Sequence, residues 1–83
     1  MTSAADDLIA VVRLLVDQPD AVRVEERATG AGPNGAELLV SVAESDRGKV
    51  IGRRGRTVDA LRALAEVRGA REGRELDLEL LDD

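Results

Sequence analysis

The sequence Gly48-Lys-Val-Ile-Gly-Arg-Arg-Gly-Arg-Thr-Val58 contains two glycines, Gly52 and Gly55, that bracket two arginines. Glycine adopts backbone conformations closed to other residues and lets a ligand approach the main chain closely. A Gly-x-x-Gly turn that opens a helix therefore presents backbone N–H groups at the positive end of the helix dipole, where phosphates bind. Arg53 and Arg54 add positive charge at the same place. The stretch predicts a loop that grips a nucleic-acid backbone.

The charge of the chain is concentrated around this loop. Residues 47–74 hold nine of the twelve basic residues and three of the seventeen acidic ones, so their net charge is +6 against −11 elsewhere. A basic patch on an acidic body steers a polyanion to one face. Ordinary solvated charge is the alternative, but clustering on a Gly-x-x-Gly turn, with Lys49 and Arg56 beside it, favours the nucleic-acid interpretation.

Length and composition restrict the other possibilities. Eighty-three residues make one small domain. The apolar residues are all aliphatic, so the core is expected to be Leu, Val, Ile and Ala, and stacking of bases on aromatic rings is excluded. The absence of Cys and His removes thiol and imidazole nucleophiles, the usual zinc sites and disulfides. With no signal-like or long apolar segment, we expect a cytoplasmic protein without membrane, cofactor or small-molecule partners.

Hydrophobic periodicity predicts the element order α-β-β-α-α-β. The first half is expected to form a helix at about residues 4–17 with Ser3 as its N-cap, and two strands, residues 21–28 and 37–43, joined by a turn at 30–35. The second half is expected to form a short helix at 46–51 capped by Ser45, a helix from Arg56 to Arg68 that stops at Gly69, and a strand with Leu76, Leu78 and Leu80 on its dry face. The fold class is therefore α+β, a three-stranded sheet with helices on its apolar side.

The segment Val50-Ile51-Gly52-Arg53-Arg54-Gly55-Arg56, set between two helices in this order of elements, resembles the K-homology (KH) domain in its bacterial, type II arrangement. The chain is similar in particular to the small stand-alone bacterial KH proteins of the KhpA type. Their GK-x-IG-x-x-G-R-T core is present whole, from Gly48 to Thr57. The resemblance covers nearly all of residues 1–83, which implies a single KH domain.

The resemblance implies how a ligand is held. Such domains clamp about four nucleotides of single-stranded RNA or DNA, with the Gly-x-x-Gly loop against the backbone. Gly52 and Gly55 would admit the sugar-phosphate, Arg53 and Arg54 would contact phosphates, and Arg56 and Lys49 would extend the positive rim. The apolar groove under the bases would be lined by Val50, Ile51, Val58 and a strand edge around residues 39–41, with Val58 and Leu61 expected to belong more to the core.

Binding of this kind is expected to be weak, salt-dependent and tolerant of sequence, because phosphate contacts position a ligand without selecting bases. A second module would raise the affinity through effective concentration. The resemblance implies such a module as well: a homodimer, or a heterodimer with a larger KH-domain RNA-binding protein. A small RNA chaperone that acts on many transcripts would fit these properties.

Three alternatives differ in class. The first is a protein-assembly module of the same fold that has lost RNA, against which the two arginines inside the loop argue. The second is a single-stranded DNA binder, since nothing in the sequence must read the 2′-hydroxyl. The third is an enzyme, which we exclude because the many carboxylates alternate along strands and lie near the termini, without a nucleophile or metal constellation.

Overall fold

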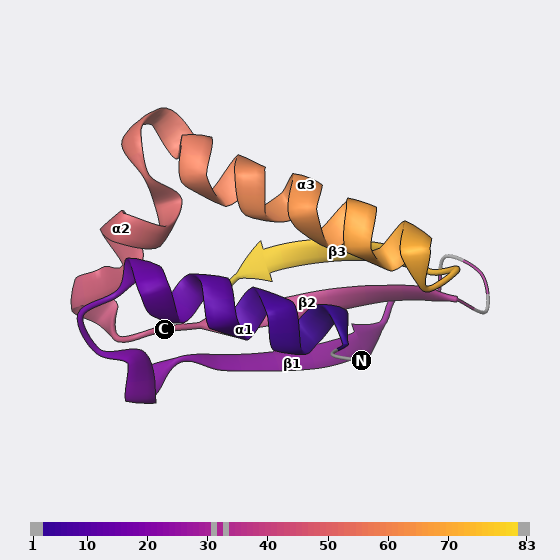
Figure 1. The fold of residues 1–83 in the computed structure, drawn as a ribbon, viewed down its shortest axis with the longest axis horizontal. Coiled ribbons are helices and arrows are strands. Elements are labelled where there is room, and N and C mark those ends of the chain that lie inside the picture. The colour runs from indigo at the N-terminus through magenta and orange to yellow at the C-terminus, as the bar shows by residue number, and fades with distance from the viewer. Residues whose placement is uncertain (1–2, 31, 33, 82–83) are drawn as a thin grey trace.

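A three-stranded sheet forms one layer of the fold, and the helices pack on one of its faces (Figure 1). The computed structural model describes residues 3–30, 32 and 34–81. Its helices and strands are α1 (Ala4–Leu15), β1 (Arg23–Ala28), β2 (Gly35–Ser41), α2 (Arg47–Ile51), α3 (Arg56–Arg71) and β3 (Glu75–Leu80). Short 3₁₀ turns at Pro19–Ala21, Glu44–Asp46 and Arg53–Gly55 precede β1, α2 and α3. The predicted α-β-β-α-α-β order and α+β class are confirmed.

The sheet has the strand order β1-β2-β3. β1 and β2 form the predicted antiparallel hairpin, although residues 31 and 33 of its turn lie outside the described part of the chain. β2 and β3 are parallel, with Leu38 opposite Leu78. A parallel pair needs a long crossover, which α2, the glycine loop and α3 supply. β2 is therefore the central strand, and residues 39–41, expected to contribute a strand edge to the groove, lie at its end.

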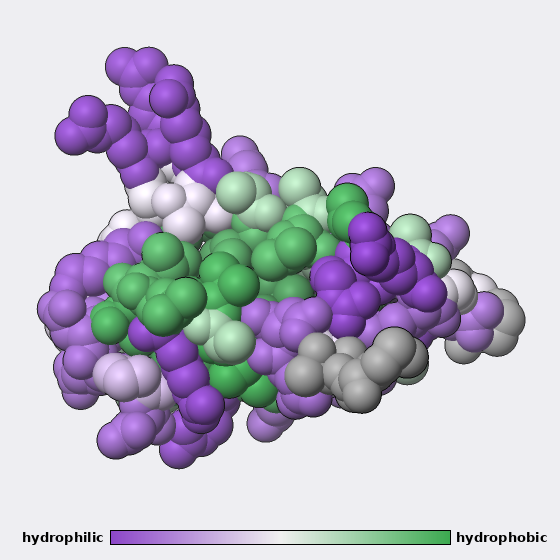
Figure 2. Space-filling view, viewed as in Figure 1, coloured by the Kyte–Doolittle hydropathy of each residue, from purple (hydrophilic) through white to green (hydrophobic). Residues whose placement is uncertain are grey.

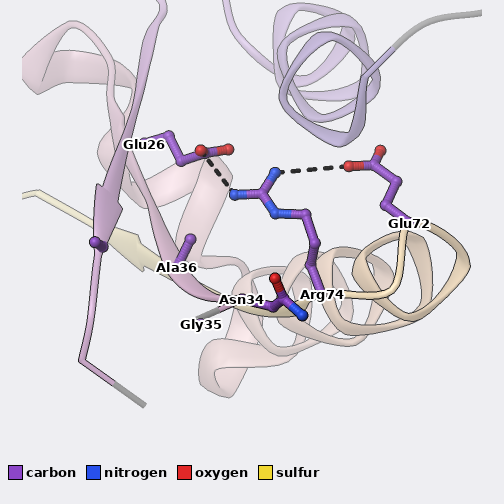
Figure 3. Close-up of a pocket in the computed structure, with 7 residues that line it drawn as sticks. Glu26, Asn34, Gly35, Ala36, Glu72 and Arg74 are labelled. Carbon is purple, nitrogen blue, oxygen red and sulfur yellow. Dashed lines mark ion pairs between the residues drawn. The ribbon is translucent and has the colours of Figure 1, made fainter. Parts of the chain in front are cut away.

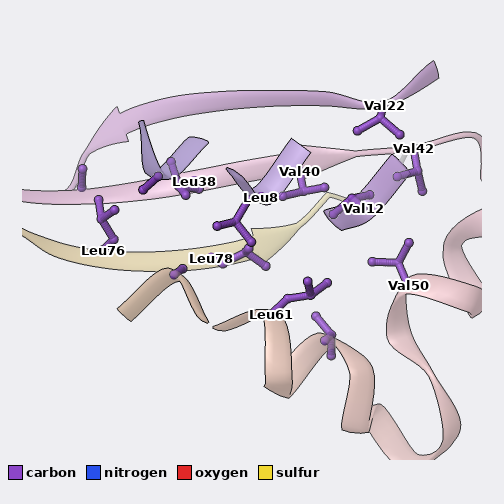
Figure 4. Close-up of a cluster of buried hydrophobic side chains, with 14 residues drawn as sticks. Leu8, Val12, Val22, Leu38, Val40, Val42, Val50, Leu61, Leu76 and Leu78 are labelled. Carbon is purple, nitrogen blue, oxygen red and sulfur yellow. The ribbon is translucent and has the colours of Figure 1, made fainter. Parts of the chain in front are cut away.

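The core lies between the sheet and the helices and is aliphatic throughout (Figure 4). Strict alternation along β2 and β3 turns Leu38, Val40 and Leu78 toward the helices. Helix α1 contributes Leu8 and Val12, which are completely buried. Burial of these side chains fixes α1 and α3 over the sheet, because each fully buried Leu or Val contributes about 1.5–3 kcal/mol.

The N-terminus of α1 carries the predicted cap. The Ser3 hydroxyl accepts from the Asp6 N–H at 3.1 Å, and the Asp6 carboxylate accepts from the Ser3 N–H at 3.3 Å. This reciprocal pair satisfies two backbone donors of the first turn. The helix ends at Leu15, two residues before the predicted end, because Val16 is already extended.

Two of the predicted helix boundaries are wrong. Ser45 does not cap α2; its hydroxyl accepts from the Gln18 side-chain amide at 3.2 Å instead. Gly69 does not end α3, which continues to Arg71. Gly69 is buried against β3, where a Cβ would lie 2.7 Å from Leu76 Cγ. A glycine at position 69 therefore lets α3 pack closely against β3.

Candidate nucleic-acid interface

The Gly52–Gly55 turn joins α2 to α3 at one end of the molecule (Figure 1). The Gly52 N–H donates to the Gly48 carbonyl at 2.9 Å and closes α2, and the Gly55 N–H donates to the Gly52 carbonyl at 3.2 Å. Gly55 is the N-cap residue of α3, and no side chain among residues 3–30, 32 and 34–81 caps this helix. The first turn of α3 therefore offers backbone N–H groups to an anion at the positive end of a sixteen-residue helix.

The two glycines of the turn meet different constraints. Gly52 has φ 75° and ψ 174°, a combination that is almost confined to glycine. A Cβ at this position would lie 2.2 Å from Thr57 Oγ1 and 2.9 Å from the Thr57 backbone nitrogen. Gly55 is left-handed, with φ 73° and ψ 12°, but a Cβ there would meet no atom within 4 Å. Sterics therefore require glycine at 52, whereas position 55 requires only a left-handed backbone.

Two arginines lie within this turn, and a third follows it. Arg53, Arg54 and Arg56 are all exposed, and within the described part of the chain no carboxylate forms an ion pair with them. Arg54 has φ 58° and ψ 27°, the left-handed region that a non-glycine residue seldom adopts. Figure 2 shows hydrophilic side chains projecting from this end of the molecule. Their positive charge is therefore available to an external anion.

Lys49 differs from the three arginines because the protein itself neutralises its charge. Its ammonium group pairs with the carboxylate of Asp17 and lies 3.6 Å from that of Asp46. The hydrogen bond with Asp17 is the main reason that the pKa of Lys49 is raised. Lys49 was predicted on the positive rim; its side chain is exposed there, with part of its charge offset by these two carboxylates.

The predicted apolar lining is placed mostly inside the protein. Val50 is fully buried, so its side chain belongs to the core and not to a groove surface. Val58 retains 8% exposure and packs in the same core, as does Leu61. Ile51 is half-buried at the end of α2, next to the turn. Of the predicted apolar contacts, Ile51 alone combines partial exposure with a position beside the loop.

Asp46, which was not among the predicted site residues, is a buried carboxylate at the start of α2. It retains 1% exposure and accepts hydrogen bonds from the backbone N–H groups of Asp17 at 3.1 Å and Gln18 at 3.0 Å. Burial alone would raise its pKa, but the two backbone donors and Lys49 outweigh burial and hold the pKa below its ordinary value. An Asp before a short helix suggests a cap, and no local pattern reveals partners at positions 17 and 18.

A charged cavity of about 400 Å³ lies beyond the opposite end of α3 (Figure 3). In it Arg74 pairs with Glu26 at 2.7 Å and approaches Glu72 to 3.6 Å. The Glu72 carboxylate also accepts from the Ala4 N–H at 2.9 Å. Pairing with Arg74 lowers the pKa of Glu26. These contacts join α1, β1 and the connection between α3 and β3, and the charged groups that line the cavity are paired with one another.

Neither a metal cluster nor a membrane span is found in the described residues. No group of three or more carboxylates at 3–30, 32 and 34–81 is arranged to hold a metal ion. No helix in this part of the chain has the length and apolarity needed to cross a membrane.

Comparison with known proteins gives one consistent result. The family model described as "KhpA/KhpB, KH domain" matches residues 5–80. The chain is 43% identical to the RNA-binding protein KhpA of Leifsonia xyli over 79 residues, 95% of this chain and 97% of the relative. It is 36% identical to RNA-binding protein KhpA of Bacillus subtilis, over 93% of this chain and 91% of the relative. The chain also superposes on part of the crystal structure of Aquifex aeolicus Era, with a TM-score of 0.60 at 22% identity. The match covers 93% of this chain and 29% of the Era chain, and it shows a similar fold.

Proposed function

This chain belongs to the KhpA/KhpB KH-domain family, and we propose that it binds single-stranded RNA by gripping the backbone with the Gly52–Gly55 turn. The observation that carries the proposal is the set of three exposed arginines, Arg53, Arg54 and Arg56, on a glycine turn that opens a long helix. Guanidinium groups and helix N-terminal N–H groups both favour phosphate oxygens. The relatives' description as RNA-binding proteins supports RNA as the polyanion.

The parts of the turn have separate roles in this proposal. Gly52 and Gly55 leave the main chain bare so that the sugar-phosphate approaches it, and the arginines contact the phosphates. Ile51 supplies an apolar contact next to the turn, while Val50 and Val58 support the turn from the core. Lys49 and Asp46 hold α2 in place. The single KH domain spans the chain and accommodates about four nucleotides.

The interface predicts weak, sequence-tolerant binding. The chain has no aromatic side chain on which a base can stack. Three phosphate contacts give a slope of log K against log[salt] of about −2. Such a grip suits a small RNA chaperone in the cytoplasm, and its affinity would rise in a homodimer or in a heterodimer with a larger KH-domain RNA-binding protein.

The test is binding of a short fluorescent single-stranded RNA at low and moderate salt. We expect wild type to bind with a clear salt slope, and Arg53→Asp/Arg54→Asp to lose about 100-fold or more in affinity while remaining folded by circular dichroism. Arg27→Gln/Arg71→Gln is the control, because it also removes two positive charges but away from the turn. Arg53→Gln/Arg54→Gln, which matches that charge change, should still lose binding.

Equal binding by wild type and the loop variants would refute the grip by the turn. Absence of binding by all of them at any salt would also refute it and would favour a protein-assembly module of KH fold that has lost RNA. A competition with single-stranded DNA of the same sequence decides the ligand. Preference for the RNA supports the proposal, whereas preference for the DNA would replace it with the DNA-binding alternative.

A further inference from the structure

We infer that Asp46 is a positioning residue for RNA binding, because its buried carboxylate ties α2, and with it the Gly52–Gly55 turn, to the segment that follows α1. The inference rests on the proposed function. It concerns how the turn is held in place before a ligand arrives. Among the described residues, Asp46 is the one charged side chain that is buried.

The tie is made of hydrogen bonds between segments far apart in sequence. Asp46 Oδ1 accepts from the Asp17 N–H at 3.1 Å, and Oδ2 accepts from the Gln18 N–H at 3.0 Å. The Gln18 side-chain amide adds a bond to Ser45 Oγ at 3.2 Å. Both carboxylate oxygens are thus used by backbone donors, which fixes the direction of the side chain and the start of α2.

Helix α2 depends on such external contacts because it has only five residues. A helix of this length is too short to be stable alone. Within it only Val50 is buried, and the Arg47 guanidinium donates to the Leu81 carbonyl at 3.1 Å. The tie through Asp46 therefore acts at the start of the helix, and the Val50 contact acts near its end. Loss of the Asp46 tie would remove one of the contacts that hold the start of α2 and would thereby displace the glycine turn.

The geometry requires a carboxylate and not merely a polar group. An asparagine has one acceptor oxygen, and its amide nitrogen would bring a donor against one of the two backbone N–H groups. That N–H group would lose its acceptor in a partly buried site. Lys49 completes the arrangement, since its ammonium lies between the Asp46 and Asp17 carboxylates and offsets the buried charge.

The experiment compares Asp46→Asn with Glu72→Gln, a variant that alters a carboxylate at the opposite end of α3. Glu72 accepts from one backbone donor, the Ala4 N–H, which the amide oxygen of a glutamine can still accept, so this control removes a carboxylate charge far from the turn. We expect folded Asp46→Asn to bind fluorescent single-stranded RNA about tenfold or more weakly, with a salt slope that is shallower by about 0.7 or more, one phosphate contact. Glu72→Gln should keep the wild-type affinity and slope at temperatures where it is folded.

A second readout needs no RNA. In the free protein, NMR amide shifts of residues 52–55 should move in Asp46→Asn and stay in place in Glu72→Gln. If Asp46→Asn does not fold, Lys49→Met replaces it as the test, because it weakens the same tie. Altered amide shifts of residues 52–55 in Lys49→Met would support the inference, and unaltered shifts would overturn it. Wild-type affinity and unchanged loop shifts in folded Asp46→Asn would also overturn it. Failure of the proposed function looks different, since RNA binding would then be indifferent to Arg53→Asp/Arg54→Asp.

Discussion

Replacing Gly52 by alanine tests the proposed interface most directly, because the structure gives the two loop glycines different costs. The backbone of Gly52 lies in a region where other residues pay about 1–3 kcal/mol. A Cβ would also overlap Thr57, with contacts of 2.2 and 2.6 Å to its side chain and 2.9 Å to its backbone nitrogen. Such overpacking costs about 1–3 kcal/mol more. Gly52→Ala therefore requires about 2–6 kcal/mol to keep the present turn, which a surface loop avoids by changing shape.

Gly55→Ala is the matched control. Its left-handed backbone costs an alanine about 1–2 kcal/mol, and no atom lies in the way of the methyl group. We expect Gly52→Ala to weaken RNA binding by about 30-fold or more, since 1.4 kcal/mol corresponds to a factor of ten. Gly55→Ala should weaken it by less, about 30-fold at most.

Fluorescence anisotropy with single-stranded RNA measures the affinities, and urea unfolding separates a displaced loop from a loss of the fold. Removing the Thr57 hydroxyl and methyl in Gly52→Ala/Thr57→Ala should not restore binding, because contacts of 2.6 Å to Cβ and 2.9 Å to the backbone nitrogen remain. Wild-type affinity in Gly52→Ala, or an equal loss in both single variants, would show that the turn is not held as described.

Three further predictions concern strain, packing and acid. Arg54→Gly should raise the free energy of unfolding by up to about 1 kcal/mol, since it relieves a left-handed arginine, and yet weaken RNA binding; lower stability in urea would contradict this. Gly69→Ala should lower the free energy of unfolding in urea by up to about 2 kcal/mol, because overpacking against Leu76 costs about 1–3 kcal/mol and the helix-propensity gain is about 1 kcal/mol; a more stable variant would refute the packing argument. Because the pKa of Asp46 is lowered in the folded state, its charge stabilises the fold above about pH 4, and this contribution is lost as pH falls through the folded pKa. In urea titrations, Asp46→Asn should therefore lose less stability on acidification than wild type does. An unchanged acid profile would contradict the direction of the pKa shift.

The order of elements and the position of the loop were predictable because they depend on local patterns. Alternation in Leu76 and Leu78 and the Gly-x-x-Gly spacing each report on a few neighbouring residues. Gly69 misled the prediction, since a glycine near a helix end is typical of a C-cap and the close approach of Leu76 is a tertiary fact.

The charges of the site were less predictable than its backbone. Sequence spacing treats Lys49 and Arg53 alike, because both are basic residues beside the glycines. The fold separates them by bringing Asp17 across to Lys49, whereas no described carboxylate pairs with Arg53. Val50 shows the same limit, since an apolar residue next to a binding loop can face either the ligand or the core, and only packing decides.

The acidic charge of the chain lies mostly outside residues 47–74, and this separation from the basic turn leads to a final prediction. Acidic side chains alternate along β3 on the sheet face that the helices leave open, at Glu75, Asp77 and Glu79. Helix α3, about 24 Å long at 1.5 Å per residue, runs from the turn toward the start of β3. At physiological salt the Debye length is about 8 Å, so the arginines act on a phosphate while most of this acidic charge is screened.

At about 0.01 M salt the Debye length reaches about 30 Å, and the acidic face then repels the same RNA. We therefore expect the plot of log K against log[salt] to follow the slope set by the arginines near 0.15 M and to flatten toward 0.01 M. Neutralising the face with Asp77→Asn/Glu79→Gln should straighten the plot at low salt and leave the affinity near 0.15 M almost unchanged. A plot that is equally straight in wild type and variant would mean that the acidic face does not influence binding.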